Sequence, residues 1–79
     1  AETVIPLELP QRSDVTVDIF DIAGRRVWSL TPGVMNAGYP RIHFNASRFS
    51  SGVYFYRISA KGLERGGNYQ SVGKMLLLK

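Results

Sequence analysis

The chain has 79 residues, a net charge of +4 and no cysteine, with 44% hydrophobic and 20% charged residues. This length allows one domain with a single core, and the apolar content with interspersed charges excludes an intrinsically disordered chain. The lack of cysteine excludes disulfides and thiolate metal sites, and no apolar run approaches the roughly 20 residues of a membrane-spanning helix. We therefore expect residues 1–79 to form one globular domain with no membrane span.

Apolar and polar residues alternate with a period of two along much of the chain, which predicts β-strands rather than helices. The first alternating segment runs from Ile5 to Leu9 and contains Pro6, which cannot donate a sheet hydrogen bond, so we predict an edge strand or a bulge there. The second covers residues 15–20, where valine and isoleucine side chains point to one face. On its opposite face, Asp18 is expected to point to solvent.

A turn at residues 21–24 leads to a third strand at residues 25–30, because Gly24 supplies a positive φ that other residues rarely adopt. Glycine, proline and asparagine mark residues 31–38 as a loop. A short fourth strand follows at Ile42 to Phe44.

The third strand does not alternate cleanly. Val27 and Leu30 both have the character of core residues but lie at positions of opposite parity. This conflict predicts either a bulge in the strand or a partly exposed Trp28.

The fifth strand, residues 53–60, is the strongest in the chain. Tyr54 and Tyr56 should point to the core and Arg57 to the wetter face. Tyr54 lies near the start of a late strand, where sandwich domains have a tyrosine corner whose hydroxyl bonds to nearby backbone. A glycine-rich turn then precedes a last strand near residues 69–78.

Six or seven short antiparallel strands cannot bury both faces of one flat sheet. The sequence therefore predicts an all-β, immunoglobulin-like antiparallel β-sandwich.

Residues suited to catalysis are sparse. The single histidine, His43, lies in the middle of a strand and faces away from its apolar neighbours, so no base is placed beside a nucleophile. The carboxylates lack the spacing of a metal site, and the glycines form no phosphate-binding loop. The arginines are scattered rather than clustered in the basic stripe of a nucleic-acid-binding protein. We expect no enzymatic activity, no cofactor, no metal and no nucleic-acid partner.

The end of the chain is unusually apolar. Leu76-Leu77-Leu78 places apolar side chains on both faces of the last strand, which is either buried on both sides or available to a partner. An open apolar edge strand allows a partner to add a strand of its own. The alternative is that this strand simply completes the sandwich, with Lys74 and Lys79 as gatekeepers against aggregation.

The ordered set of motifs resembles the C-terminal sorting domain, type A, of the type IX secretion system of Bacteroidetes-like bacteria. The resemblance rests on residues 5–10, 15–30, 37–45, 51–58 and 74–79. Its structural motif residues are Gly24, Arg25, Gly38, Gly52, Tyr54, Tyr56 and Arg57. The segment that the translocon would recognise is Lys74, Met75, Leu76, Leu77, Leu78 and Lys79.

The resemblance implies a non-catalytic address. The cargo protein reaches the periplasm, the outer-membrane translocon recognises the sorting domain, and a surface sortase-like protease removes it. The cargo is then released from the cell or attached to anionic lipopolysaccharide at the cell surface. Because the chain opens with Ala1 rather than methionine, we expect a module cut from a larger secreted protein.

Two other functions fit the same pattern. One is an accessory module that binds carbohydrate, for which Trp28 and Tyr39 are the aromatic residues expected at the surface. The other is a structural role like that of the flagellar hook-capping protein, which has a similar sandwich pattern.

Overall fold

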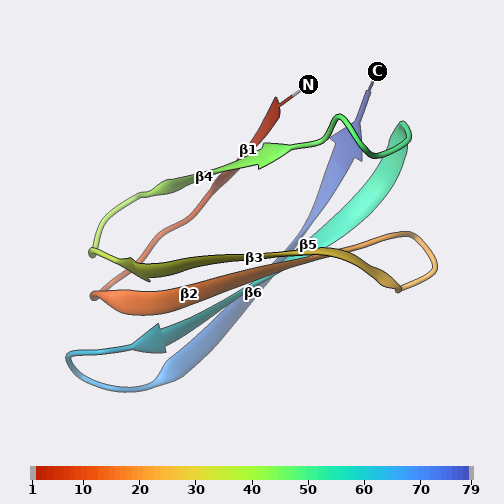
Figure 1. The fold of residues 1–79 in the computed structure, drawn as a ribbon. Coiled ribbons are helices and arrows are strands. Elements are labelled where there is room, and N and C mark those ends of the chain that lie inside the picture. Colours follow the sequence, from red (N-terminus) through yellow and green to blue (C-terminus); the bar gives the residue numbers. More distant parts are fainter. Residues whose placement is uncertain (1, 79) are drawn as a thin grey trace.

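The computed structural model describes residues 2–78 and shows six strands in two antiparallel sheets (Figure 1). The smaller sheet pairs β1 (Glu2–Pro6) with β4 (Arg41–Asn45). The larger sheet has the strand order β3-β2-β5-β6. Its strands are β2 (Ser13–Phe20), β3 (Arg26–Met35), β5 (Gly52–Gly62) and β6 (Asn68–Leu77). The prediction of an all-β antiparallel sandwich is confirmed.

The two sheets enclose one hydrophobic core. Ile5 and Phe44 come from the smaller sheet, and Val17, Ile19 and Ile58 come from the larger one, all of them fully buried. Full burial of a side chain of this size contributes about 1.5–3 kcal/mol. A domain of this size has few such side chains, so its stability depends on each of them.

An aromatic cluster fills one end of this core. The ring of Phe44 lies 6.1 Å from that of Trp28 and 5.4 Å from that of Phe49, measured between centroids. Phe49 is also 6.1 Å from Trp28 and 5.9 Å from Tyr54, in edge-on arrangements that aromatic pairs favour. The cluster connects β3, β4, β5 and the loop between β4 and β5 across both sheets.

The chain beyond Pro6 stays hydrogen-bonded to the residues that precede β4. The Leu7 N–H donates to the Pro40 carbonyl at 3.2 Å, and Leu9 and Gly38 exchange two hydrogen bonds of 2.8 and 2.9 Å. Pro6 is tolerated because β1 lies at a sheet edge, as predicted. The bridge between Leu9 and Gly38 extends the smaller sheet beyond its two named strands.

The third strand is longer than predicted. Residues 31–35, which were expected in a loop, belong to β3. β3 continues to Met35 through Pro32 and Gly33. Pro32 is accommodated because β3 is an edge strand and because its register against β2 shifts between Val15 and Val17.

The parity conflict in β3 is resolved by a second register shift. Ile19 pairs with Trp28 and Phe20 pairs with Arg26, so Val27 is an extra residue without a partner in β2. Val27 and Leu30 therefore both pack against the core, and Trp28 is half-buried beside them. Both the predicted bulge and the predicted partial exposure of Trp28 are present.

Gln11 links the start of the larger sheet to the β5–β6 turn. Its side-chain amide donates to the Gly66 carbonyl at 2.9 Å and accepts from the N–H groups of Glu64 and Arg65 at 3.1 and 2.8 Å. A Cβ on Gly62 would collide with this amide and would lie 2.6 Å from the Gly66 carbonyl oxygen. Glycine at position 62 therefore leaves room for the link.

Phe44→Ala is expected to lower the free energy of unfolding by about 3–5 kcal/mol, because it leaves a cavity where the aromatic cluster meets the core. Val34→Ala, at an exposed position of β3, is the matched control and should change stability by less than about 0.5 kcal/mol. Urea unfolding followed by circular dichroism measures both. Equal effects of the two substitutions would contradict the placement of Phe44 at the centre of the core.

Candidate functional site

The candidate site is the surface of β6, the strand that contains most of the segment predicted for recognition. Its side chains alternate between the two faces of the sheet. Met75 and Leu77 point into the core and are 9% and 3% exposed, whereas Leu76 and Leu78 are 60% and 74% exposed. The last strand is thus neither buried on both sides nor excluded from the core. Lys79, also predicted for recognition, lies outside the described residues.

The exposed leucine of β6 belongs to an apolar patch on the outer face, defined here as the face of the larger sheet turned away from β1 and β4. Leu76 pairs with Val53, and Phe55 pairs with both Phe20 and Lys74. Directly paired side chains on one face of a sheet lie in contact range, and diagonal neighbours remain within reach of large side chains. We call this the outer patch: Phe20, Val53, Phe55, Val72 and Leu76.

β6 also has a free edge. It is the last strand in the order β3-β2-β5-β6, and within residues 2–78 no strand pairs with its other side. Unpaired backbone groups at such an edge form a template for another strand. The direction of these groups follows from the register of β5 and β6.

The register determines which β6 residues present their backbone to the free edge. The Gly62 N–H donates to the Gly67 carbonyl at 2.8 Å, and from Lys61↔Asn68 to Gly52↔Leu77 the pairing continues without a shift. Hydrogen-bonded and non-hydrogen-bonded pairs alternate along an antiparallel ladder. The odd-numbered residues from Tyr69 to Leu77 therefore bond to β5, and the even-numbered residues from Gln70 to Leu76 direct their N–H and C=O groups to the free edge.

The two properties of β6 coincide. The even-numbered residues that face the free edge with their backbone are the same ones that carry their side chains on the outer face. Val72, Lys74 and Leu76 are all exposed there. A strand that joined this edge would therefore bond to these residues and contact their side chains at the same time.

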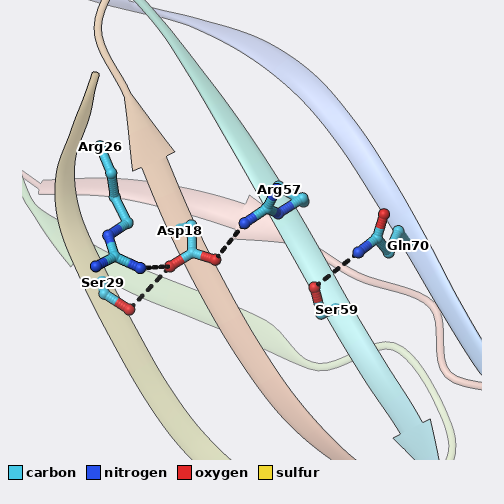
Figure 2. A network of polar contacts seen from close by, with 6 residues as sticks. All are labelled: Asp18, Arg26, Ser29, Arg57, Ser59 and Gln70. Atoms are coloured by element: carbon cyan, nitrogen blue, oxygen red, sulfur yellow. Dashed lines mark hydrogen bonds and ion pairs between the residues drawn. The ribbon is translucent and has the colours of Figure 1, made fainter. Parts of the chain in front are cut away.

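A polar network crosses the rest of the outer face (Figure 2). Asp18 in the centre of β2 accepts a hydrogen bond from the Ser29 hydroxyl at 2.9 Å and one from the Arg57 guanidinium at 3.1 Å. Arg26 lies 3.8 Å from the same carboxylate. The Arg57 guanidinium also sits over the ring of Phe20, 5.1 Å from its centroid, and so joins the network to the outer patch.

Asp18 corrects one prediction. It lies on the outer face as expected, but its exposed fraction is only 6%. The sequence pattern indicates the face but not the arginine side chains from β3 and β5 that surround the carboxylate there. Burial raises the pKa of Asp18, but the hydrogen bonds from Arg57 and Ser29, with the charges of Arg57 and Arg26, outweigh it and lower the pKa overall.

The predicted motif residues at the β2–β3 turn have a structural role. Gly24 has a φ of 85°, which favours glycine, and its N–H donates to the Asp21 carbonyl at 3.0 Å. The Asp21 carboxylate accepts from the N–H groups of Arg25 and Ala23 and from the Arg25 guanidinium. The Arg25 backbone bond, together with its side chain and the Ala23 N–H, lowers the pKa of Asp21. The motif thus closes the hairpin.

The remaining motif residues shape the strands around β6. The Tyr54 hydroxyl donates to the Ser50 carbonyl at 3.0 Å, as a tyrosine corner does, and Tyr56 lies across Gly73, where a Cβ would collide with its ring. Gly38, with a φ of 133°, forms the bridge to Leu9, and Gly52, with a φ of 153°, begins β5 opposite Leu77. Gly52, Tyr54 and Tyr56 thus lie opposite β6 in the sheet, whereas Gly38 belongs to the contact between the first segment and the chain before β4.

The residues weighed for other functions do not form a second site. His43 is exposed on β4, and among residues 2–78 no group of three or more His, Asp or Glu side chains is arranged to hold a metal ion. Of the two aromatics expected at the surface, Tyr39 is exposed but Trp28 packs against Phe44 and Phe49. The described part of the chain has no helix long and apolar enough to cross a membrane.

Residues 1–66 match the protein family described as the secretion system C-terminal sorting domain. The matched range is well over half of the 79 residues. The chain belongs to this family. Its members are the C-terminal sorting signals of type IX secretion, which direct a cargo protein through the outer membrane to the cell surface or the medium. No curated protein and no solved structure matches the chain.

Sequence reasoning missed part of this surface. The sequence predicts recognition by a continuous run from Lys74 to Lys79. In the described part of that run only Lys74, Leu76 and Leu78 are exposed, and Val53, Phe55 and Val72 lie on the same face from outside it. The alternation of side chains along β6 indicates which residues share the outer face, because Val72, Lys74, Leu76 and Leu78 are all even-numbered. The residues of β5 that adjoin β6 on this face can be identified only from the register of the two strands, which the sequence does not give.

Asp18→Asn is expected to lower the free energy of unfolding at pH 7 by about 1.5–3 kcal/mol, the range for hydrogen bonds to charged groups. The folded pKa of Asp18 is depressed, so its contribution is present above the unfolded value of about 3.9 and is lost as the pH falls through the folded value. The stability difference between wild type and variant should therefore shrink below about pH 4. Urea unfolding at several pH values measures it, and a difference independent of pH would contradict a charged Asp18.

The four even-numbered amides from Gln70 to Leu76 should exchange with solvent faster than the three odd-numbered amides between them. The reason is that only the odd-numbered N–H groups bond to β5. Residue-resolved hydrogen exchange by NMR measures the pattern. Uniform protection along β6 would show that another segment covers the free edge.

Proposed function

We propose that this sorting domain is a non-catalytic address whose C-terminal strand is read by the outer-membrane translocon of type IX secretion. Membership of the sorting family over residues 1–66 is the observation that carries the proposal. The recognition segment is Lys74 to Lys79, which lies beyond the matched range. In the described part of that segment, Lys74, Leu76 and Leu78 form the exposed side.

The exposed side of β6 supports this assignment. Large apolar side chains that are exposed together mark interaction surfaces more often than single exposed residues do. Leu76 adjoins Val53 and Phe55 on the outer face, and Leu78 follows it along the chain. Folding does not account for this exposure, because Met75 and Leu77 already complete the core on the other face.

The address belongs to a larger secreted protein of which residues 1–79 form the single sorting domain. The cargo crosses the periplasm, and the domain then brings it to the translocon. A surface sortase-like protease removes the domain, and the cargo is released or attached to anionic lipopolysaccharide. The net charge of +4 is favourable for a domain that passes an anionic surface.

The carbohydrate-binding and structural alternatives have less support. Of the two aromatic residues that a stacking platform for sugar rings would use, Trp28 is half-buried and packs against Phe44 and Phe49. The family match concerns sorting and not polysaccharide binding or hook capping.

Leu76→Asp and Leu77→Asp separate recognition from folding. Leu76 is exposed, so Leu76→Asp should leave the melting temperature nearly unchanged and lower export of a fused periplasmic reporter by about tenfold, the value of one lost apolar contact. Leu77 is buried, so Leu77→Asp should cost several kcal/mol by placing an unpaired charge in the core. Reporter activity in the medium of a host with the secretion system, and thermal unfolding of each purified domain, measure the two effects.

Leu63→Asp is the matched control, because Leu63 is an exposed apolar residue directly after β5, at the end of the β5–β6 ladder opposite to Leu76. It should change neither folding nor export. Export of Leu76→Asp at the wild-type level would contradict recognition through the outward side of β6. Deletion of residues 74–79 is a less specific test, since it also removes the buried Met75 and Leu77.

A further inference from the structure

We propose that β6 binds its receptor by strand addition, in which an extended segment of the receptor pairs with the free edge of β6 and covers the outer patch. This inference rests on the proposed function and specifies how the address is read. The partner strand carries apolar side chains opposite Val72 and Leu76 and an acidic side chain near Lys74.

The four edges of the two sheets differ in the features that block pairing. β1 contains Pro6 and β3 contains Pro32 with two register shifts, and β4 has only five residues and follows Pro40. Proline, irregular register and short length are the features by which proteins block unwanted pairing at an edge. β6 has ten residues, no proline and an unshifted register against β5. Among the described edges it is the one that lacks all three of these features.

The backbone groups at the edge of β6 are directed toward a partner strand. The N–H and C=O groups of Val72, Lys74 and Leu76 point to the free edge, as the register shows. Alternate residues of an added strand would therefore find a donor and an acceptor on β6 without any change in the β5–β6 ladder. Backbone pairing supplies affinity in this mode of recognition, and alternate side chains supply specificity.

The charge of β6 favours a partner strand with an acidic side chain. Residues 68–79 contain Lys74 and Lys79 and no aspartate or glutamate. Opposite charges across paired strands are favourable and like charges are unfavourable. A second copy of β6 would bring only positive charge to the pairing, so charge complementarity selects a receptor strand with an acidic residue over self-association.

Val72→Pro tests the backbone contact directly. It removes an N–H that points to the free edge and no hydrogen bond to β5. Val72→Thr is the matched control, because it keeps the N–H and nearly the same shape at a position that is 69% exposed. Thermal unfolding of each variant, export of the reporter, and binding to detergent-solubilised type IX translocon purified from the host are the measurements.

Val72→Pro is expected to lower translocon binding and export by about tenfold while Val72→Thr retains both, since one backbone bond and the close approach of two strands are lost. Gln70→Pro, which also removes an edge-facing N–H, serves with Gln70→Thr if Val72→Pro does not fold. Normal binding of a folded proline variant overturns strand addition and leaves the proposed function standing. A wild-type domain that neither binds the translocon nor directs export overturns both proposals.

The charge of the partner is tested at Lys74. Lys74→Glu should lower translocon binding more than Lys74→Gln, and raising the salt concentration should reduce the difference between wild type and Lys74→Gln. Equal binding by wild type and Lys74→Glu overturns the acidic partner strand. The other possible occupant of the edge is a second copy of this domain, which size-exclusion chromatography with light scattering detects. A wild-type dimer that Val72→Pro converts to a monomer would assign the edge to that second copy and overturn the proposal.

Discussion

The antiparallel register between β5 and β6 is the constraint on which the candidate site depends. Because that register runs without a shift, the same alternation sends Met75 and Leu77 into the core and Leu76 outward, and directs the backbone of the even-numbered residues to the free edge. A slip by one residue would exchange all of these positions. The sandwich core holds the register in place, so folding and presentation of the address are coupled.

The outer face has two parts with different roles. In its centre, the Asp18 carboxylate joins β2 to β3 and β5 through Ser29, Arg26 and Arg57. Next to it, the outer patch carries apolar side chains, of which Val72 and Leu76 are exposed. Arg57 contacts both parts, because its guanidinium binds Asp18 and lies over Phe20. The polar network thus stabilises the strands whose apolar ends form the patch.

Much of the fold followed from the sequence, because period-two alternation, turn glycines and the tyrosine corner are local signals. The alternation placed Val17 and Ile19 in the core, and the position of Tyr54 predicted a bond from its hydroxyl to nearby backbone, which the structure shows at the Ser50 carbonyl. The predicted length of β3 and the predicted exposure of Asp18 were wrong, because both depend on partners in other strands. The sequence predicts the candidate site as a segment and not as a surface, since the neighbours of Leu76 are set by strand order and register.

Hydrogen exchange of the sorting domain, alone and bound to the purified translocon, tests the central claim most directly. The account predicts that slowed exchange on binding is concentrated at the even-numbered amides of β6 from Gln70 to Leu76, whose N–H groups are free in the isolated domain. Slowed exchange confined to β1 and β4, with β6 unchanged, would contradict the account.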